Sequence, residues 1–432
     1  MPKKIIIISY FYSPANMMGA IRMTKISKYL HYDKYDLDVI TSDNSSLLFQ
    51  KEKCDIDPTL QKDVEGLSVF RVRHGLFYSF VSKIVRRHYA SSDYDQKNIK
   101  KIKKHNYKKK IIHYLAYFLS RWQDRDFAVK GKKIFKKIAS KEGNIIIASY
   151  GPVASFSLAL KIKRKTDVFI ADFRDPIAQN SNYKLEYKLN RKIEKKVIKK
   201  ANYVVAVSKG YLNSLGLNEN GKNIVITNGY DYEDIQKKET KSINDKCVFA
   251  YVGTLYSGRR DITPFLKALD ELKRDNCIDI NKIELLYAGP QGECFLDACR
   301  KFSMLDIAKN YGQVTRNEAL NIQSSSNCII VLTWNDYPNQ GILPGKFYES
   351  MLFDKPLLVM VSGDYGDSEI KHLLGKKAGF CYEAADLNSF DNLKSFVLDI
   401  YNRKCSFDNA DFSCFNYKNI THRYEDIISK EI

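Results

Sequence analysis

The sequence predicts an α/β fold of two doubly wound domains, each built on a parallel β-sheet with helices on both faces. The chain has 432 residues, which at roughly 150 residues per domain is too many for one ordinary core. Hydrophobic residues make up 44% of it, enough to fill packed cores. Short runs of Ile, Val and Leu alternate with amphipathic stretches, as in proteins whose parallel strands are buried on both faces.

The composition also excludes several classes of protein. No run approaches the roughly 18 consecutive apolar residues that span a bilayer. The N-terminal segment MPKKIIIISYFYSP has an apolar run too short for the core of a signal peptide. The 9 cysteines are scattered and form no CxxC pair, which argues against a disulfide framework or a zinc site. We therefore expect a soluble cytoplasmic protein without a bound metal.

The first half of the chain contains apolar runs of strand length, separated by stretches with helical periodicity. The expected strands are Ile5–Tyr10, Leu37–Thr41, Leu67–Arg73, Ile145–Ser149, Val168–Asp172, Tyr203–Val207 and Ile224–Thr227. The expected helices between them include Ala20–Leu30, Asp124–Ser140 and Glu186–Lys200. This alternation predicts a first doubly wound domain over residues 1–235.

The second half repeats the scheme. Its expected strands are Cys247–Val252, Ile283–Ala288, Cys328–Leu332 and Pro356–Val361, and its expected helices are Ile262–Lys273, Asn317–Ser324 and Lys346–Phe353. Residues 232–246 are polar, charged and without periodicity, which predicts the boundary there. We expect the second domain over residues 246–415, followed by a helix over 416–432 that packs back toward the first domain.

The net charge of +20 is concentrated in the first half of the chain. Residues 1–240 hold 47 lysines and arginines against 24 aspartates and glutamates, a net charge of +23, and the remaining residues come to −3. A basic half joined to a nearly neutral half suggests a domain that faces a polyanion, either nucleic acid or an anionic membrane. A solvated, lysine-rich surface is the alternative.

The densest basic stretch, residues 79–121, is interpreted as an insertion in the first domain. It has 12 basic residues against 2 acidic ones, and an apolar patch at Ile111–Phe118 directly follows its lysines. Such a combination suits a helix at a membrane interface, although the patch could also pack on the core of its own domain. The residues expected to contact a membrane are Lys100, Lys101, Lys103, Lys104, Lys108, Lys109, Lys110, Ile111, Tyr114 and Phe118.

Two segments of the first domain follow expected strands. Gly19 lies near the start of the first helix, where free N–H groups and the positive end of the helix dipole can hold a phosphate, although an ordinary tight turn would look the same. Neither GxGxxG nor GxxxxGK[ST] is present, which disfavours a nicotinamide site and a P-loop. Asp172, Arg174 and Asp175 come at the end of a buried strand, where we expect them to point into a cleft rather than into the core.

The candidate catalytic residues are therefore Asp172, Arg174 and Asp175, with their individual roles left open. They could place a carboxylate beside a substrate hydroxyl. Alternatively, Arg174 could tie down the loop through either carboxylate, which would be a purely structural role.

In the second domain, Arg259 and Arg260 lie after a strand and a glycine turn, at the start of a helix. Adjacent guanidinium groups beside free N–H groups suit a diphosphate, and a solvated pair is the alternative. Further along, residues 341–343 (Gly341, Ile342 and Leu343) form a loop before a helix that carries Lys346 and Glu349. Apolar neighbours surround Glu349 in the sequence, so we expect an outside group such as a ribose diol to hydrogen-bond its carboxylate.

Eight segments of the chain, in the same order, resemble the motifs of one enzyme family. They are IIIISYFYSPANMMGAIRMTKISKYL, IADFRDP, ANYVVAVSKGYLNSL, IVITNGYD, YVGTLYSGRRD, YAGP, GQVTRNEAL and PGKFYESMLFDKP. On these motifs the chain resembles glycosyltransferase family 4, whose GT-B fold has two facing Rossmann-like domains with a cleft between them. The resemblance covers nearly the whole chain apart from residues 79–121. It implies that the N-terminal domain holds the acceptor and the C-terminal domain the nucleotide sugar.

The chain departs from that family at three places. Glu349 matches the second glutamate of the family's Glu-x7-Glu motif, which binds the nucleotide ribose, but Gly341 stands where the first glutamate would be. The sugar contacts of the missing glutamate then come from the backbone N–H groups of the following loop, or are lost. Thr254 replaces the first basic residue of the family's glycine turn, so by resemblance the diphosphate role falls to Arg259 or Arg260.

The third departure concerns the active-site histidine of the family. The chain has no histidine directly after the strand at 145–149, and Asp172 and Asp175 are the candidates to replace it. The family also implies that the configuration of the transferred sugar is retained.

The sequence and the resemblance together predict a retaining glycosyltransferase of the hexosyl or N-acetylhexosaminyl type. It would use a nucleotide-diphosphate sugar as co-substrate, with no further cofactor and no metal, because none of the eight segments contains the DxD pair that metal-dependent transferases use to hold a divalent ion. Its acceptor would be lipid-linked or a polysaccharide, in the synthesis of capsule, O-antigen or exopolysaccharide, on the inner face of the cell membrane. The N–H groups near Gly19, one of the paired arginines and Lys346 would stabilise the negative charge that grows on the leaving diphosphate.

Two other functions stay open from the sequence. A nucleotide-sugar epimerase of the same fold would need its own catalytic acid and base, and would have no use for a basic, membrane-seeking insertion. A nucleic-acid-binding protein is suggested by charge alone, and the chain has no RRM, KH or helix-turn-helix signature. We therefore expect no nucleic-acid partner.

Overall fold

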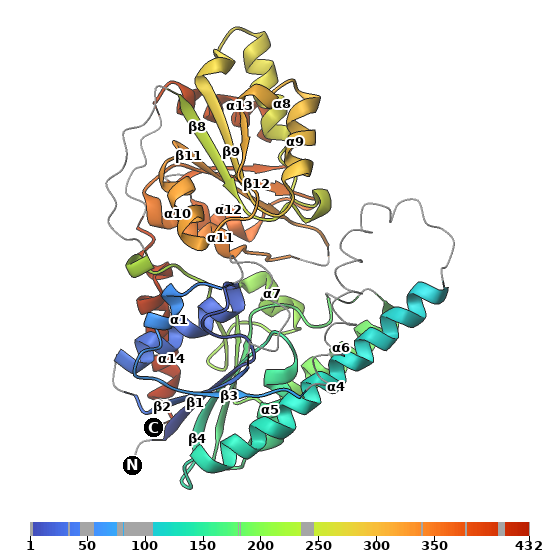
Figure 1. The fold of residues 1–432 in the computed structure, drawn as a ribbon, viewed down its shortest axis with the longest axis vertical. Helices are drawn as coiled ribbons and strands as arrows, with labels where there is room; N and C mark the ends of the chain where they lie inside the picture. The colour runs from blue at the N-terminus through green and yellow to red at the C-terminus, as the bar shows by residue number, and fades with distance from the viewer. Residues whose placement is uncertain are drawn as a thin grey trace. The chain divides into compact units, whose positions relative to one another are not determined.

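The computed structural model describes residues 3–32, 35–43, 56–75, 81, 107–179, 181, 183–234, 246–337, 340–375, 378–404 and 411–431. The chain separates into two compact units (Figure 1). Unit 1 comprises Met1–Asn228 and Tyr417–Ile432, and unit 2 comprises Gly229–Asn416. None of the helices in these described ranges is long and apolar enough to cross a membrane.

Unit 1 is built on a sheet of parallel strands. Its described strands are β1 (Lys4–Ser9), β2 (Leu37–Ser42), β3 (Ser68–Val72), β4 (Asn144–Ser149), β5 (Val168–Phe173), β6 (Tyr203–Ala206) and β7 (Asn223–Val225). Their order in the sheet is β3-β2-β1-β4-β5-β6-β7, and all neighbours run parallel. Because consecutive parallel strands need crossover connections, helices cover both faces of the sheet.

The strand β1 shows why the sheet is buried on both sides. Its isoleucines alternate between the faces, as a period of two requires. Ile6 and Ile8 join one hydrophobic core, whereas Ile5 and Ile7 join the core on the opposite face. All four side chains are fully buried.

The described helices of unit 1 divide between these two faces (Figure 1). Residues of α1 (Met18–Tyr32), α2 (Thr59–Lys62) and α14 (Tyr417–Ile428) pack on the face of Ile5. Residues of α4 (Tyr107–Ile138), α5 (Ala154–Ile162), α6 (Lys184–Lys200) and α7 (Lys209–Ser214) pack on the face of Ile6. The C-terminal helix α14 thus closes the core of unit 1 although it follows unit 2 in the sequence.

The helix α4 is much longer than expected. The sequence predicted it from Asp124, whereas it begins at Tyr107. Residues 107–121 therefore form the first half of this helix, and its second half packs on α5. Gly131 lets the two helices approach closely, because a Cβ at this position would lie only 2.6 Å from Leu158 Cδ2. The apolar patch Ile111–Phe118, expected as a helix at a membrane interface, is thus continuous with the helix expected from Asp124. Residues 82–106 of the expected insertion lie outside the described residues.

Unit 2 repeats the architecture of unit 1. Its described strands are β8 (Cys247–Val252), β9 (Ile283–Ala288), β10 (Ala308–Asn310), β11 (Cys328–Trp334), β12 (Leu357–Ser362) and β13 (Gly379–Glu383). They form a parallel sheet in the order β10-β9-β8-β11-β12-β13. The edge strands β10 and β13 were not predicted, because AKN and GFCYE have no strong apolar alternation.

The described helices of unit 2 also cover both faces of their sheet. On one face lie α8 (Thr263–Arg274), α9 (Gly292–Lys301) and α13 (Ser389–Tyr401). On the other lie α10 (Arg316–Ser324), α11 (Gly345–Ser350), which continues into the 3-10 helix η8 (Met351–Phe353), and α12 (Glu369–Leu374). A further 3-10 helix used below is η4 (Tyr232–Asp234).

In both sheets the strand order reverses beside the first strand of the unit. The reversal lies between β1 and β4 in unit 1, and between β8 and β11 in unit 2. At such a point the loops that follow the two strands diverge to opposite faces, which leaves a crevice at the carboxyl ends of the strands where ligands bind. The predicted fold class, two Rossmann-like parallel-sheet domains, is confirmed.

A buried ion pair and its hydrogen bonds join four elements of unit 1. Arg22 of α1 and Asp172 of β5 are both fully buried, and Arg22 Nη2 lies 2.9 Å from Asp172 Oδ1. Tyr424 of α14 donates to the same oxygen at 3.0 Å, and Ser149 of β4 donates to Oδ2 at 2.7 Å. The Arg22 guanidinium also donates to the carbonyl of Ile226 at 2.9 Å. Both charges are thus fully hydrogen-bonded inside the unit.

Replacing Asp172 with alanine should destabilise the protein severely. Arg22 would be left buried without a carboxylate, and loss of one partner of a buried pair costs about 3–5 kcal/mol. The matched control is Asp175→Ala, whose half-exposed carboxylate should contribute no more than about 1 kcal/mol. Thermal unfolding of both variants measures this, and equal melting temperatures for the two would contradict the structural role of Asp172.

Candidate functional site

The carboxyl edge of the unit 2 sheet gathers several of the predicted site residues. The loop after β8 carries Arg259 and Arg260, and β11, on the other side of the reversal point, ends at Trp334. The loop that leads into α11 contains Gly341–Leu343. Parallel strands bring all these segments to one edge, which is where ligands bind in such sheets.

The two arginines lie against aromatic rings. The Cζ atom of Arg259 is 5.1 Å from the centroid of the Trp334 ring, and that of Arg260 is 5.6 Å from the same centroid. Arg260 also lies 4.6 Å from the ring of Tyr256, which has a positive φ of 48°. Stacking of this kind orders long cationic side chains without neutralising them, so the positive charge stays available to an anion.

Arg259 and Arg260 differ in how firmly they are held. Arg260 donates from Nη1 to the carbonyl of Thr254 at 3.1 Å, and its Nε is buried without a hydrogen-bond acceptor among the described residues. Arg259 is about half exposed and makes one long ion pair, 3.9 Å, with Asp336. Arg259 is therefore the more accessible of the two guanidinium groups.

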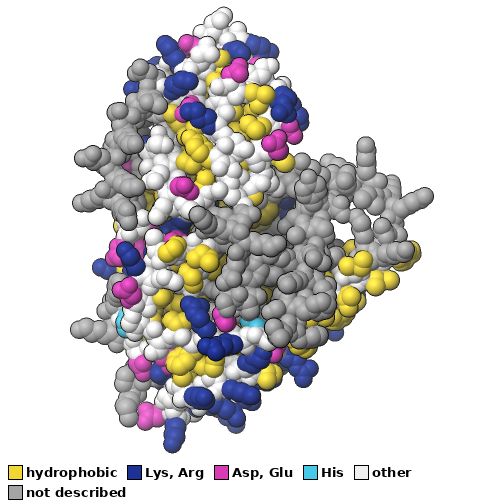
Figure 2. Space-filling model, viewed as in Figure 1, with side chains coloured by type: hydrophobic (Ala, Val, Ile, Leu, Met, Phe, Trp, Pro, Cys, Tyr) yellow, Lys and Arg dark blue, Asp and Glu magenta, His cyan; other side chains and the backbone are white. Residues whose placement is uncertain are grey.

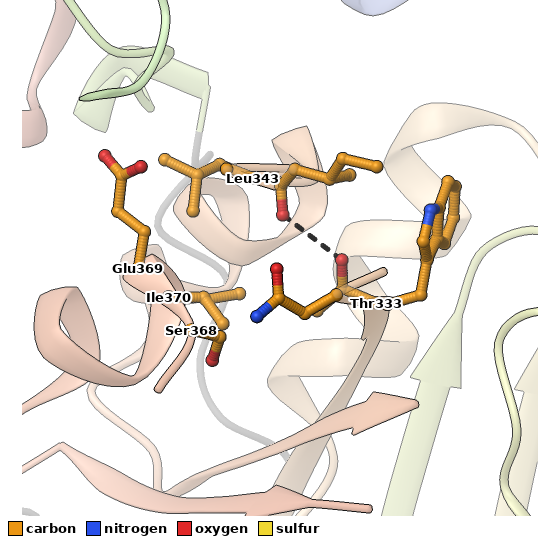
Figure 3. Close-up of a pocket in the computed structure, with 9 residues that line it drawn as sticks. Thr333, Leu343, Ser368, Glu369 and Ile370 are labelled. Atoms are coloured by element: carbon orange, nitrogen blue, oxygen red, sulfur yellow. Dashed lines mark hydrogen bonds between the residues drawn. The ribbon is translucent and has the colours of Figure 1, made fainter. Parts of the chain in front are cut away.

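A small hollow lies beside this aromatic cluster (Figure 3). The space inside it is about 180 Å³, a value that includes open solvent at its mouth. Its lining consists of Thr333, Trp334, Asn335, Gly341, Ile342, Leu343, Ser368, Glu369 and Ile370. The hydroxyl of Thr333 donates to the carbonyl of Ile342 at 3.2 Å, which fixes the loop before α11 against the end of β11. Gly341 has a positive φ of 77°, a conformation in which a glutamate would be strained.

The carboxylate of Glu349 already has cationic partners, contrary to our expectation of apolar surroundings. It accepts from Arg316 Nε at 3.2 Å through Oε1, and Lys346 donates to Oε2. Arg316 Nη2 in turn lies 2.8 Å from Asp234 Oδ2. Apart from Lys346, these side chains are nearly buried, and together the four have balanced charge. We call Asp234, Arg316, Lys346 and Glu349 the ion cluster.

The ion cluster keeps Glu349 ionised. Burial alone would raise the pKa of this carboxyl, but the charges of Lys346 and Arg316 and their hydrogen bonds lower it below its usual value. Each carboxylate oxygen has two lone pairs, and Oε2 accepts from Lys346 alone among the described residues, so it can accept one more donor. Glu349 is thus an ionised acceptor with free capacity on one oxygen.

In unit 1, the expectation that Asp172 points into a cleft is wrong. Its carboxylate is enclosed by Arg22, Ser149 and Tyr424, as described above. A residue's place at the end of a buried strand does not determine whether its side chain points to the core or to solvent. Here the Asp172 carboxylate lies in the core because it pairs with Arg22, 150 residues away in the sequence.

Asp175 is about half exposed, whereas the Arg174 side chain is mostly buried. Arg174 pairs with Asp175 at 2.8 Å and donates from Nε to the carbonyl of Tyr150 at 2.7 Å. A Cβ on Gly19 or on Gly151 would overlap the Arg174 guanidinium, so both glycines make room for it. Gly19 and Arg174 were predicted as separate site residues, and the fold brings them into contact at the reversal between β1 and β4.

The predicted membrane-contact residues lie on α4 where they are described. Apolar side chains that are more than half exposed recur along this helix, and they include Tyr107, Ile111, Leu115 and Phe118. Figure 2 shows hydrophobic side chains gathered at one end of α4, with lysines and arginines further along it. Tyr114 is half-buried against Tyr183, and Lys110 is exposed. Lys100, Lys101, Lys103 and Lys104, with the side chains of Lys108 and Lys109, lie outside the described residues.

Sequence reasoning missed four residues of the unit 2 edge. Trp334 ends an apolar run, and Tyr256 follows the glycine turn, so each could have been found by inspecting the residues just after the strands. Arg316 follows the helix cap Thr315 in GQVTRNEAL, and Asp234 lies in η4, with nothing in the sequence to connect either residue to Glu349. These contacts span 33 and 82 residues and arise only on folding.

No protein-family model and no curated protein matches the sequence. The fold is similar to solved structures along the whole chain. The apo form of WaaB, a lipopolysaccharide outer core galactosyltransferase, is 12% identical with a TM-score of 0.57, and the match covers 99% of this chain and 100% of that one. Sucrose-phosphate synthase from Thermosynechococcus elongatus is 12% identical with a TM-score of 0.59, covering 99% of this chain and 98% of that one.

A third similar structure is a UDP-N-acetylglucosamine 2-epimerase. It is 12% identical with a TM-score of 0.51, and the match covers 98% of this chain and 95% of that one. At such identities the likeness concerns the fold. The chain has the GT-B fold, with one Rossmann-like parallel sheet in each unit.

The ion cluster makes the stability of unit 2 depend on pH. Because the pKa of Glu349 is depressed in the folded state, its charge stabilises the fold above its unfolded pKa of about 4.5, and this contribution is lost as the pH falls through the folded-state pKa. Glu349→Gln should therefore lower the melting temperature at neutral pH, with the difference from wild type shrinking below about pH 4. The exposed Glu293→Gln is the control and should follow wild type throughout. A Glu349→Gln difference that does not change with pH would refute the charged role.

Proposed function

We propose that the protein is a glycosyltransferase that moves a sugar from a nucleotide-diphosphate sugar to a lipid-linked or polysaccharide acceptor, with retention of configuration. The role would lie in the synthesis of a cell-surface polysaccharide, on the inner face of the membrane. The observation that carries this proposal is the unit 2 edge, where Arg259 and Arg260 stack on Trp334, which lines the hollow. The loop that lines the same hollow leads into α11, which carries the ionised, nearly buried carboxylate of Glu349. A nucleotide-diphosphate sugar presents an anionic diphosphate, a ribose diol and a sugar, which match these three features in chemistry.

In this proposal each part of the donor has an assigned partner. Arg259, the accessible guanidinium, binds the diphosphate, and Arg260 is a second cation behind it. Glu349 accepts a hydrogen bond from the ribose diol through Oε2. The hollow beside Gly341–Leu343 takes the sugar, which backbone groups of this loop would contact in place of a glutamate side chain.

The proposed chemistry needs stabilisation of a leaving group. The bond between the anomeric carbon and the diphosphate oxygen breaks, and a bond to the oxygen of the acceptor hydroxyl forms on the same face of the sugar. The proton of that hydroxyl passes to the departing diphosphate. Negative charge grows on the diphosphate as this happens, and fixed cations in a partly dry site stabilise that charge more in the transition state than in the ground state. Lys346 can contribute because it is about one-third exposed beside Glu349.

Unit 1 would supply the acceptor side. Arg174 and Asp175 are the candidates there, with the start of α1 near Gly19 beside them. Asp172 takes no part, because its carboxylate is enclosed in the core.

An epimerase is the second candidate, since a UDP-N-acetylglucosamine 2-epimerase has a similar fold. The two functions differ in what happens to a nucleotide sugar without an acceptor. Only an epimerase converts it to an isomer, whereas a transferase leaves it unchanged or hydrolyses it slowly. Chromatography of the nucleotide sugar after incubation with the protein alone decides between them.

A nucleotide sugar of the correct type should raise the melting temperature of the protein. A panel of UDP-, GDP- and CDP-sugars tests this, since a ligand at 100-fold its dissociation constant adds about 2.7 kcal/mol to the free energy of unfolding. The matching free sugars, without nucleotide, are the controls and should have no effect. If no member of the panel shifts the transition, the proposed donor class is wrong.

Replacing Arg259 and Arg260 together with alanine should lower kcat more than it weakens donor binding. The reason is that the charge on the diphosphate is largest in the transition state. Arg274→Ala with Arg300→Ala, two exposed arginines elsewhere in unit 2, is the matched control. An unchanged kcat in the Arg259 and Arg260 variant would remove these residues from the mechanism.

We also propose that the exposed apolar side chains of α4, with the lysines before them, hold unit 1 on an anionic membrane. Lysines near such a surface are worth about 1 kcal/mol each, and buried apolar side chains add a salt-resistant part. Wild type should therefore sediment with vesicles of phosphatidylcholine and phosphatidylglycerol, but poorly with phosphatidylcholine alone. Changing Lys100, Lys101, Lys103, Lys104, Lys108, Lys109 and Lys110 to glutamine should abolish this sedimentation.

The control for this experiment changes three exposed unit 2 lysines, Lys273, Lys282 and Lys301, to glutamine. This control should sediment like wild type. If the two variants sediment equally, the lysines of residues 100–110 form only a solvated surface.

A further inference from the structure

Arg316 is a buried cation shared by two carboxylates. It is the first residue of α10, and its side chain is 7% exposed. Its Nη2 lies 2.8 Å from Asp234 Oδ2, and its Nε donates to Glu349 Oε1 at 3.2 Å. The three residues come from η4, α10 and α11, so the guanidinium joins elements that are far apart in the sequence.

The geometry of a guanidinium explains why an arginine is needed here. It is planar, always charged, and presents donors in fixed directions, so it can hold two carboxylates at once in a defined orientation. A lysine offers one compact ammonium and cannot reach both in the same way. Asp234 occupies one edge of the Arg316 guanidinium, which prevents the group from rotating away from Glu349.

Arg316 and Lys346 contact different oxygens of the Glu349 carboxylate. Arg316 occupies Oε1 of the carboxylate, whereas Lys346 approaches Oε2 from one turn earlier in α11. Lys346 is about one-third exposed and can exchange its contact for another, but Arg316 is enclosed and cannot. The carboxylate is thus anchored on its inner oxygen, and its other oxygen keeps the capacity to accept a ligand hydroxyl.

We propose that Arg316 is a positioning residue of the nucleotide-sugar site, which holds the Glu349 carboxylate ionised and oriented toward the ribose, with Asp234 fixing Arg316 in turn. This inference rests on the proposed function. It adds to that function two residues, Asp234 and Arg316, that neither the family motif nor the sequence pattern identifies.

The charged groups around Glu349 determine the expected pH behaviour. Arg316 approaches it from α10 and Lys346 from its own helix, and Asp234 from η4 reaches it through Arg316. Without Arg316, burial of the carboxyl is opposed by Lys346 alone. Its pKa should therefore rise, and the ligand-binding form should be lost at a higher pH than in wild type.

The test is titration calorimetry of Arg316→Met, Arg316→Lys and Asp234→Asn with UDP, GDP and CDP between pH 5 and 8. The exposed Arg300→Met is the control. We expect Arg316→Met to weaken binding of the preferred nucleotide about 10- to 100-fold at pH 7, as expected when a charged hydrogen bond is lost. The ratio of variant to wild-type affinity should fall further toward pH 5. This ratio cancels the titration of the nucleotide's own phosphate, which is the same for all proteins.

The other two variants separate charge from orientation. Arg316→Lys should keep the pH profile close to that of wild type, because a cation remains, but should still bind more weakly. Asp234→Asn should weaken binding less than Arg316→Met does, and it provides the test if Arg316→Met does not fold.

Three results would overturn the inference. If folded Arg316→Met binds the nucleotide with wild-type affinity and pH dependence, Arg316 is only a structural residue, whatever its melting temperature. If that variant does not fold and the other two bind like wild type, the same conclusion holds. If wild type itself binds none of the nucleotides, the proposed function fails, and the inference fails with it for that separate reason.

Discussion

A buried guanidinium needs a carboxylate beside it to balance its charge, and each unit of this protein contains one such arginine. In unit 1, Arg22 meets Asp172, and in unit 2, Arg316 meets Asp234 and Glu349. Desolvation of such a charge is offset only when the carboxylates and hydrogen bonds around it are nearly ideal, so the elements that carry them have little freedom to shift. The helices α1, α14, α10 and α11 are therefore held both by their apolar contacts and by these ion pairs.

The two ion pairs nevertheless leave different groups available. Around Asp172, hydrogen bonds from Arg22, Ser149 and Tyr424 use both oxygens, and the carboxylate is fully buried. Its role is to bind α14 to the sheet of unit 1. Around Glu349, one oxygen is anchored and the other still has acceptor capacity, next to a cation that is partly exposed. A buried arginine–carboxylate pair thus leaves Asp172 with no access for a ligand, whereas it leaves Glu349 with one oxygen that can still accept a hydrogen bond.

Glu349 also differs from Asp172 in having further cations and a hollow at the same edge of its sheet. Arg259 and Arg260 stack on Trp334, which lines the hollow together with the loop before α11, and α11 carries Lys346 and Glu349. The groups are continuous along one edge of one sheet, at the point where the strand order reverses. We assign the donor to this unit because its edge holds two cations and an ionised carboxylate, the groups that a diphosphate and a ribose diol need.

Much of the fold was predictable because it depends on local patterns. The isoleucines of β1 and the apolar runs of β8, β9 and β11 reveal parallel strands buried on both faces, and they fix the carboxyl edge where Arg259 and Glu349 are found. The continuity of α4 was not predicted, because the sequence pattern placed the patch Ile111–Phe118 and the helix from Asp124 in two separate segments. Contacts that form only on folding were also missed. The Asp172 carboxylate is buried against Arg22, and the Glu349 carboxylate pairs with Arg316. In both cases the partner is far away in the sequence.

The central claim is that the unit 2 edge binds a nucleotide-diphosphate sugar through Arg259 and Glu349. The most direct test is a crystal structure of the protein with the nucleoside diphosphate that stabilises it most. The account predicts the diphosphate within hydrogen-bond distance of the Arg259 guanidinium, and a ribose hydroxyl within hydrogen-bond distance of Glu349 Oε2. A nucleotide that is bound elsewhere, with the Glu349 carboxylate still contacting only Arg316 and Lys346, would contradict it.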